Sequence, residues 1–199
     1  MRIIGITGPI AAGKSTVDGM LRELGADPVI DGDLVVHELY ASSRELRDAL
    51  VAAFGPDVRD PDDGIDRRAL GAHVFGNPEA LRTLEGLVHP AVRAAVRARL
   101  EAAAPDAIAV VDAVKLLQGD LADLCTARWW VATSPEAQRR RLVEGRGLSP
   151  DEAERRIAAQ PRLEDYRSRV DLVIDNSGPL AATRQQVRAG WQALESRER

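Results

Sequence analysis

The chain has 199 residues, enough for one sizeable folded domain. Apolar residues make up 45% of it and charged residues 29%, as in ordinary folded proteins, and the net charge of −4 disfavours a general nucleic-acid surface. Cys125 is the single cysteine, which excludes an internal disulfide framework and favours a reducing cytosol. No run is long and apolar enough to cross a bilayer, and no signal peptide precedes the first predicted strand. We therefore expect a cytoplasmic, monomeric protein with small-molecule partners and neither nucleic-acid nor membrane partners.

A phosphate-binding loop is the strongest signal in the sequence. Residues 8–15 fit the pattern G-x-x-x-x-G-K-[ST]. They follow an apolar strand predicted over residues 3–7 and precede a helix predicted over residues 16–24. A plain glycine turn before a helix is the alternative, but the order strand, loop, helix favours nucleotide binding.

The residues within this loop each have a chemical task. Gly8 and Gly13 permit the backbone angles with which successive N–H groups surround a polyphosphate at a helix N-terminus. Lys14 reaches the β- and γ-phosphates in this pattern, and the Ser15 hydroxyl ligates Mg²⁺. The chain has 25 arginines and only two lysines, Lys14 and Lys115, so a lysine in the loop indicates a need for a compact ammonium group.

Two aspartates follow the second predicted strand, at residues 28–30. If the chain stays extended there, Asp31 and Asp33 point the same way, into a crevice. Such carboxylates either orient Mg²⁺-bound water or accept a proton from an attacking hydroxyl. Asp33 is also a good N-cap for a helix over residues 34–40. We weigh site and cap equally for Asp31, favour a site role for Asp33, and interpret His37 as a packing residue or one behind the site.

Residues 42–104 are predicted to form a mainly helical block, interrupted by a surface loop at residues 55–64. Its helices are expected to begin at Ser42 (with Glu45 as a capping box), Asp66, Asn77-Pro78 and His89-Pro90. The third of these helices would end near Val88, so that His89 lies at a helix start, where a side chain can be aimed at a cleft. A structural histidine is the interpretation we favour.

A third strand is predicted over residues 107–111, and its continuous apolar character indicates a parallel strand buried on both faces. Asp112 ends it as a Walker B aspartate does, where the carboxylate holds Mg²⁺ through water. For Lys115 we consider a phosphate or carboxylate contact but favour a solvated loop residue. A fourth strand is expected over residues 127–133, with its two tryptophans packed in the sheet.

An arginine-rich helical hairpin follows, with helices that begin at Ser134 and Ser149 and a glycine break over residues 145–147. The arginines are Arg139, Arg140, Arg141, Arg146, Arg155 and Arg156. Guanidinium groups on a closing lid stabilise a transferring phosphoryl group and exclude water. We favour such a lid over a solvated hairpin, without deciding which arginine enters the site.

The last elements are a fifth strand over residues 170–174, a turn over residues 175–178 and a helix over residues 179–194. The helix should bury one stripe, formed by Leu180, Val187, Trp191 and Leu194. Alternating strands and helices predict a three-layer α/β fold with a five-stranded parallel sheet. We divide it into a core (about 1–40, 105–134 and 168–195), a helical acceptor block (about 42–104) and a lid (about 135–167).

In this order the motifs resemble those of the dephospho-CoA kinase family, P-loop kinases of the nucleoside-monophosphate-kinase-like fold. The likeness extends from Arg2 to about Val187. The matching segments are residues 5–8, 13–16, 29–33, 84–85, 89–90, 135–138, 141–142, 148–149, 152–153, 156–157, 160 and 173–178.

The resemblance implies ATP-dependent phosphorylation of the ribose 3′-hydroxyl of dephospho-CoA, with Mg²⁺. The residues implied to bind ATP are Gly8, Ala11, Ala12, Gly13, Lys14, Ser15, Thr16, Arg141, Asn176 and Gly178, with Mg²⁺ on Ser15. Those implied to act in catalysis are Asp33 as the base, Lys14, and Arg141 as a lid arginine. Asp33, His89 and Lys115 are the candidates for acceptor binding.

Three departures from the family pattern stand out. Pro9 and Ala11 replace usual glycines, residues 112–118 differ from the common segment after the third strand, and Gly145 replaces an arginine that Arg146 can substitute. The alternatives are a P-loop kinase of another small acceptor, such as a nucleoside monophosphate, and a non-catalytic nucleotide-binding protein. A GTPase is disfavoured because no N-K-x-D motif occurs.

Overall fold

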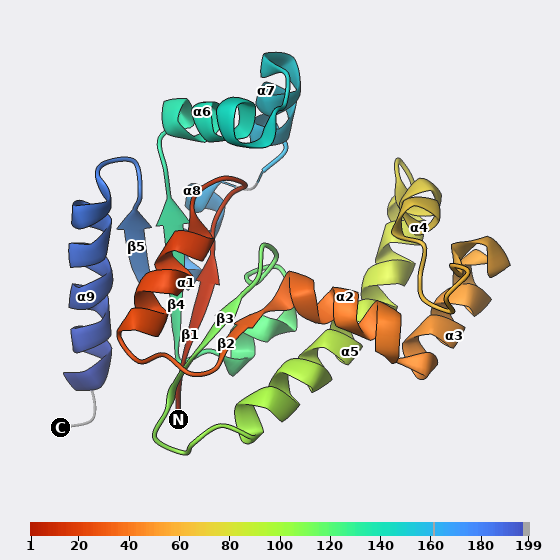
Figure 1. Ribbon diagram of the computed structural model, residues 1–199, viewed down its shortest axis with the longest axis horizontal. Helices are drawn as coiled ribbons and strands as arrows, with labels where there is room; N and C mark the ends of the chain where they lie inside the picture. The colour runs from red at the N-terminus through yellow and green to blue at the C-terminus, as the bar shows by residue number, and fades with distance from the viewer. Residues whose placement is uncertain (161, 197–199) are drawn as a thin grey trace. The chain divides into compact units, whose positions relative to one another are not determined.

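The computed structural model describes residues 1–160 and 162–196. It contains two compact units, one formed by Met1–Ile30 with Ala103–Arg199 and the other by Asp31–Ala102 (Figure 1). The strands are β1 (Arg2–Thr7), β2 (Val29–Asp31), β3 (Ile108–Asp112), β4 (Ala127–Ala132) and β5 (Leu172–Asp175). The helices are α1 (Lys14–Glu23), α2 (Gly32–Ser42), α3 (Arg44–Phe54), α4 (Arg67–Val74), α5 (Pro78–Glu101), α6 (Pro135–Arg146), α7 (Pro150–Ala158), α8 (Leu163–Tyr166) and α9 (Leu180–Ser196).

The strands form one sheet in the order β2-β3-β1-β4-β5, and β1 pairs in parallel with both β3 and β4. The predicted five-stranded parallel sheet is therefore confirmed. All five residues of β3 are buried, as expected for a strand covered on both faces. Ile6 pairs with Asp112, so the loop that follows β1 and the aspartate that ends β3 emerge at the same edge of the sheet.

Helices α1 and α9 cover one face of this sheet. Ile4 and Ile6 belong to one buried cluster with Val17 of α1 and with Val187 and Trp191 of α9. The prediction that Leu180 belongs to the buried stripe is wrong, because this side chain is 60% exposed. Leu180 is the first residue of α9, and the buried stripe begins one turn later, at Thr183.

The segment after β3 packs near the opposite side of β1. A Cβ atom at Gly5 would lie 2.6 Å from the side chain of Leu116 and 2.7 Å from Sγ of Cys125, so β1 needs a glycine there. Trp129 and Trp130 are both buried, and Trp130 stacks on Tyr166 of α8 with ring centroids 6.3 Å apart. The interpretation of both tryptophans as sheet packing is confirmed.

The second unit is helical, as predicted, and α5 packs against α2, α3 and α4. The expected helix boundary near Val88 is wrong, because α5 continues through Pro90 to Glu101. A proline removes one backbone hydrogen bond from a helix. The buried residues Val88, Val92, Val96 and Leu100 form a stripe that extends from just before Pro90 to the end of the helix, and this packing favours a helix that continues past the proline. His89 therefore lies inside a helix and not at its start.

The caps of two helices also differ from the prediction. Asp31, not Asp33, caps α2, and its side chain accepts hydrogen bonds from the N–H groups of Asp33 and Leu34. The chain turns helical at Gly32, so the two aspartates do not lie on one extended segment. Ser43, not Ser42, caps α3, because α2 extends through Ser42. The expected caps Asp66, Asn77, Ser134 and Ser149 are confirmed.

The two compact units do not have the same boundaries as the predicted core, acceptor block and lid. Helix α2 belongs to the helical unit, which begins at Asp31, and the predicted lid belongs to the same unit as the sheet.

Within residues 1–160 and 162–196, no helix is long and apolar enough to cross a membrane.

Candidate active site

The backbone of the loop between β1 and α1 requires glycine at both ends. Gly8 has φ +149°, and a Cβ atom there would lie 2.3 Å from the carbonyl oxygen of Val131. Gly13 has φ +95°, and a Cβ atom there would lie 2.1 Å from Nδ2 of Asn176. Neither contact nor conformation suits any other residue. The two glycines of the sequence motif are thus fixed by sterics as well as by backbone angle.

The loop leads directly into the N-terminus of α1. Gly13 is the N-cap of α1 and provides no side-chain cap, so the first N–H groups of the helix are available to an anion. Lys14 begins the helix, and its Nζ lies 3.9 Å from a carboxylate oxygen of Asp112, with both side chains largely buried. Ser15 follows and is exposed. This arrangement suits the binding of phosphate groups, and it places the ammonium group beside the aspartate that ends β3.

The donors near the loop also suit a magnesium ion. Mg²⁺ prefers oxygen ligands and usually binds one or two protein groups together with phosphates and water. The Ser15 hydroxyl and the Asp112 carboxylate supply such oxygens, and Lys14 links Asp112 to the loop. The residues present therefore fit the metal that the motif implies.

Arg141 of α6 donates hydrogen bonds to backbone carbonyl groups of the loop. Its Nη1 donates to the carbonyl oxygens of Ala11 and Ala12, at 3.0 and 2.9 Å, and to Oγ1 of Thr133 at 3.3 Å. Its Nη2 donates to the carbonyl oxygen of Asn176 at 2.7 Å. The expected contact of this arginine with the transferring phosphoryl group stays a prediction, but the same guanidinium has a loop-holding role that the sequence did not indicate.

Asn176 contacts the loop through its side chain. It is buried, and its Nδ2 donates to the carbonyl oxygen of Ala12 at 2.8 Å while its Oδ1 accepts from Oγ1 of Thr183 at 3.0 Å. Gly178 lies two residues further, in the turn after β5. Within this turn Asp175 accepts a hydrogen bond from Ser177, which lowers the pKa of the Asp175 carboxyl. The expected adenine contacts of Asn176 and Gly178 stay predictions.

Two glutamines that the sequence analysis did not assign to the site hold the tip of the loop. Nε2 of Gln138 donates to the carbonyl oxygen of Ile10 at 2.8 Å, and Oε1 of Gln160 accepts from the N–H group of Ile10 at 3.2 Å. Both lie in the segment predicted as a lid. Gln138 is only 5% exposed, which is uncommon for a glutamine, and no spacing within the predicted helix marks it as buried.

The arginines of the predicted lid have different surroundings. Arg139 pairs with Glu154, which raises the pKa of the arginine, and Arg156 pairs with Glu152 at 2.7 Å. Arg140 and Arg146 are exposed. Arg156 and Glu152 are four residues apart, the spacing at which opposite charges pair on the surface of a helix.

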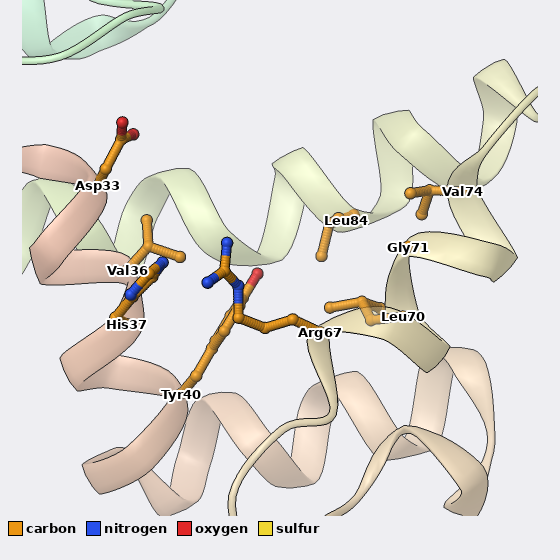
Figure 2. Close-up of a pocket in the computed structure, with 9 residues that line it drawn as sticks. All are labelled: Asp33, Val36, His37, Tyr40, Arg67, Leu70, Gly71, Val74 and Leu84. Carbon is orange, nitrogen blue, oxygen red and sulfur yellow. The ribbon is translucent and has the colours of Figure 1, made fainter. Parts of the chain in front are cut away.

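The helical unit contains a pocket of about 520 Å³ (Figure 2). Its lining residues are Asp33, Val36, His37, Tyr40, Arg67, Leu70, Gly71, Val74 and Leu84. Asp33, His37 and Tyr40 come from α2, and Arg67 comes from the start of α4. Burial raises the pKa of Tyr40, and the nearby Arg67 charge partly offsets this shift. The pocket therefore combines a carboxylate, a cation and a neutral phenol with an apolar wall.

The other two residues predicted to bind the acceptor, His89 and Lys115, do not line this pocket. His89 is half-buried in the middle of α5, and Lys115 is exposed in the turn after β3. His37, interpreted as a residue behind the site, lines the pocket. Arg67 and Tyr40 were missed, because the sequence gives no sign that α4 places its first turn beside α2.

A phosphate loop at the end of the first strand of a parallel sheet, followed by a helix that begins with lysine, defines the class of P-loop nucleotide-binding proteins. A solved structure of shikimate kinase from Acinetobacter baumannii has the same fold, with a TM-score of 0.58 over 98% of this chain and 94% of that chain, at 17% identity. A crystal structure of a Thermus thermophilus protein is more similar, with a TM-score of 0.83, 32% identity and coverage of 97% of both chains.

The family is shown by sequence comparison. The dephospho-CoA kinase family model matches residues 2–182. The dephospho-CoA kinase of Symbiobacterium thermophilum is 46% identical over 195 residues, which cover 97% of this chain and 81% of that protein. The chain belongs to the dephospho-CoA kinase family.

Proposed function

We propose that this protein transfers the γ-phosphoryl group of ATP to the ribose 3′-hydroxyl of dephospho-CoA, giving CoA and ADP. The observation that carries the proposal is the family match over residues 2–182, which includes both the phosphate loop and the helical unit. The chemistry of the loop and of the pocket agrees with it. Phosphoryl transfer depends mainly on positioning and on stabilisation of charge on the phosphate oxygens, and N–H groups, a lysine and arginines supply that stabilisation.

The phosphate loop is the proposed ATP site. Residues 11–16 would surround the phosphates at the positive end of α1, and Lys14 would contact the β- and γ-phosphates. Ser15 and Asp112 would hold Mg²⁺, which neutralises charge on the phosphates when it is bound. Arg141, Asn176 and Gly178 complete the set that we assign to ATP.

The pocket of the helical unit is the proposed acceptor site. Asp33 lines it and would orient the 3′-hydroxyl and accept its proton. Arg67 provides a cation that suits the phosphate groups of dephospho-CoA, and the apolar wall formed by Leu70, Val74 and Leu84 suits its uncharged parts. We retain His89 and Lys115 as candidate acceptor contacts on the strength of the family resemblance.

A panel of acceptors tests the proposal. ADP release is measured with dephospho-CoA, AMP, dCMP and shikimate at equal concentrations, and ³¹P NMR of the product locates the new phosphate. Among the four acceptors, we expect only dephospho-CoA to support ADP release, and we expect its product to show a new 3′-phosphomonoester signal. Turnover with another acceptor only, or ADP release that is independent of any acceptor, would reject the assignment. We also propose that the protein acts as a monomer in the cytoplasm, which sedimentation and cell fractionation test.

A further inference from the structure

The loop is held by a chain of hydrogen bonds that starts inside the core. Oγ1 of Thr183, on α9, donates to Oδ1 of Asn176 at 3.0 Å, and Nδ2 of Asn176 donates to the carbonyl oxygen of Ala12 at 2.8 Å. Thr183 is 0% exposed and Asn176 is 2% exposed. The carbonyl oxygen of Ala12 can only accept, so the Nδ2 end of the Asn176 amide faces the loop, and the Thr183 hydroxyl holds the amide in place by donating to its Oδ1 end.

Arg141 joins this chain at the same carbonyl group. The carbonyl oxygen of Ala12 accepts one hydrogen bond from Nη1 of Arg141, at 2.9 Å, and another from Nδ2 of Asn176. Both of its lone pairs are therefore used. One of these donors is a cation. The guanidinium is fixed in turn by the carbonyl oxygen of Asn176 at 2.7 Å. The side chain of Asn176 therefore binds the loop directly. Its backbone carbonyl group binds Arg141, which also binds the loop.

The network stabilises a backbone conformation that is costly by itself. Ala11 has φ +57°, a left-handed conformation that is unfavourable for an alanine because its Cβ atom approaches the following carbonyl oxygen. Such residues persist where the surroundings determine the conformation. The contacts from Arg141 to the carbonyl oxygens of Ala11 and Ala12 supply that determination.

The same contacts act on the N–H group that follows. The carbonyl group of Ala12 and the N–H group of Gly13 belong to one peptide unit, so donors on the carbonyl oxygen polarise the N–H group and make it a stronger donor. Gly13 is the N-cap of α1, at the end of the helix where a phosphate binds.

We propose that Thr183 is a positioning residue for phosphate binding. It acts through Asn176 to orient the peptide between Ala12 and Gly13, and together with Arg141 it directs a polarised N–H group of Gly13 towards the nucleotide phosphates. The proposal depends on the loop as a phosphate site and not on the identity of the acceptor. Binding measured without an acceptor therefore separates its failure from a failure of the proposed reaction.

The test compares Thr183→Val with Thr183→Ser. Valine keeps the shape and removes the donor, leaving the buried Oδ1 of Asn176 without this bond, whereas serine keeps the hydroxyl. Calorimetry with ADP and with inorganic pyrophosphate should give a Kd raised about three- to tenfold for Thr183→Val with both ligands, and a Kd within about twofold of the wild type for Thr183→Ser. Pyrophosphate has no adenine, so an equal loss for both ligands locates the effect at the phosphates.

Val187→Ala is the matched control. Val187 lies one turn further along α9, is 0% exposed and belongs to the same core, so its truncation lowers stability without removing a polar contact. We expect a lower melting temperature with an unchanged Kd for ADP. If Thr183→Val does not fold, Thr183→Ala removes the hydroxyl with less crowding.

Amide NMR gives a direct reading of the polarisation. The N–H proton of Gly13 should move upfield in Thr183→Val and keep its wild-type shift in Thr183→Ser and Val187→Ala. An unchanged Kd for both ligands in Thr183→Val would overturn the proposal. So would a loss confined to ADP, or an equal loss in Val187→Ala.

Discussion

Asp31 accepts a hydrogen bond from the backbone N–H group of Asp33 at 2.8 Å, so the first of these two aspartates caps α2 while the second lines the pocket of the helical unit. The two carboxylates have different surroundings although they are two residues apart. Asp31 also accepts from Leu34 at 3.1 Å, which is the usual pattern of an N-cap. Variants at Asp31 and Asp33 therefore test the helix cap and the proposed general base separately.

Asp33→Asn should lower kcat by about 10²- to 10⁴-fold, the range that a general base contributes. Asparagine keeps the size of the side chain but cannot accept the proton of the 3′-hydroxyl. The Kd for ATP should change by less than about twofold, because the phosphates bind at the loop. Steady-state rates with dephospho-CoA and calorimetry with a non-hydrolysable ATP analogue measure the two quantities. A mutant with wild-type turnover would remove Asp33 from the chemistry.

Asp31→Ala should reduce stability instead. Loss of an N-cap costs about 1 kcal/mol. Asp31→Asn is the control, since asparagine caps a helix as well as aspartate does, and it should unfold close to the wild type. Urea unfolding followed by circular dichroism measures the difference. The prediction fails if Asp31→Asn and Asp31→Ala are equally destabilised, because the carboxylate charge would then matter more than the cap.

Two glycines near the start of α1 should respond to alanine in opposite ways. Gly13→Ala places a methyl group 2.1 Å from Nδ2 of Asn176 at φ +95°, so it should abolish measurable ADP binding and lower the melting temperature. Gly19→Ala lies within the helix, with no atom within 4 Å of the new methyl group, and should stabilise the protein by about 0.5–1 kcal/mol with unchanged ADP binding. Calorimetry and thermal unfolding of both variants provide the comparison.

Lys14→Ala should weaken ATP binding and lower turnover by about a hundredfold or more, because it removes the ammonium group of the loop. It also removes the partner that lies 3.9 Å from Asp112, so a largely buried carboxylate loses a nearby positive charge. Lys14→Arg keeps the charge but not the compact shape, and we expect it to recover little turnover. Full activity in Lys14→Arg would show that charge alone suffices at this position.

The sequence predicted best where local physics decides the structure. The phosphate loop, the five parallel strands and most helix caps depend on short patterns of glycine, apolar and capping residues, and these were found correctly. The break expected at Pro90 was wrong because tertiary packing along Val92 and Val96 outweighs one lost hydrogen bond. The exposed Leu180 has a similar origin, since periodicity does not show where a helix starts to contact the sheet.

The site was predicted less completely than the fold. Lys14 and Asp112 were expected near the phosphates from their motifs, and they lie together. The contacts of Thr183 with Asn176, and of Gln138 and Gln160 with Ile10, join residues more than 100 positions apart or on different elements. No spacing rule in a single sequence connects such residues, because only the sheet order and the helix orientations place them side by side.

Cys125 gives a pH-dependent prediction. Burial raises the pKa of its thiol to about 12, whereas an unfolded cysteine has a pKa of about 8.5. Below the unfolded value both states keep the proton and the stability is full. Between about pH 9 and 12 only the unfolded state loses it, so the free energy of unfolding should fall by up to about 1.4 kcal/mol per pH unit.

Cys125→Ala isolates this contribution from that of Tyr40, whose pKa is also raised. The variant should show a shallower loss of stability in urea unfolding between pH 9 and 11 than the wild type. At pH 8 the native thiol should react with Ellman's reagent far more slowly than the urea-unfolded chain, because the thiolate is the reactive form. Equal reaction rates in the two states, or the same pH slope in wild type and Cys125→Ala, would show that the thiol titrates normally and is not shielded at its position beside Gly5.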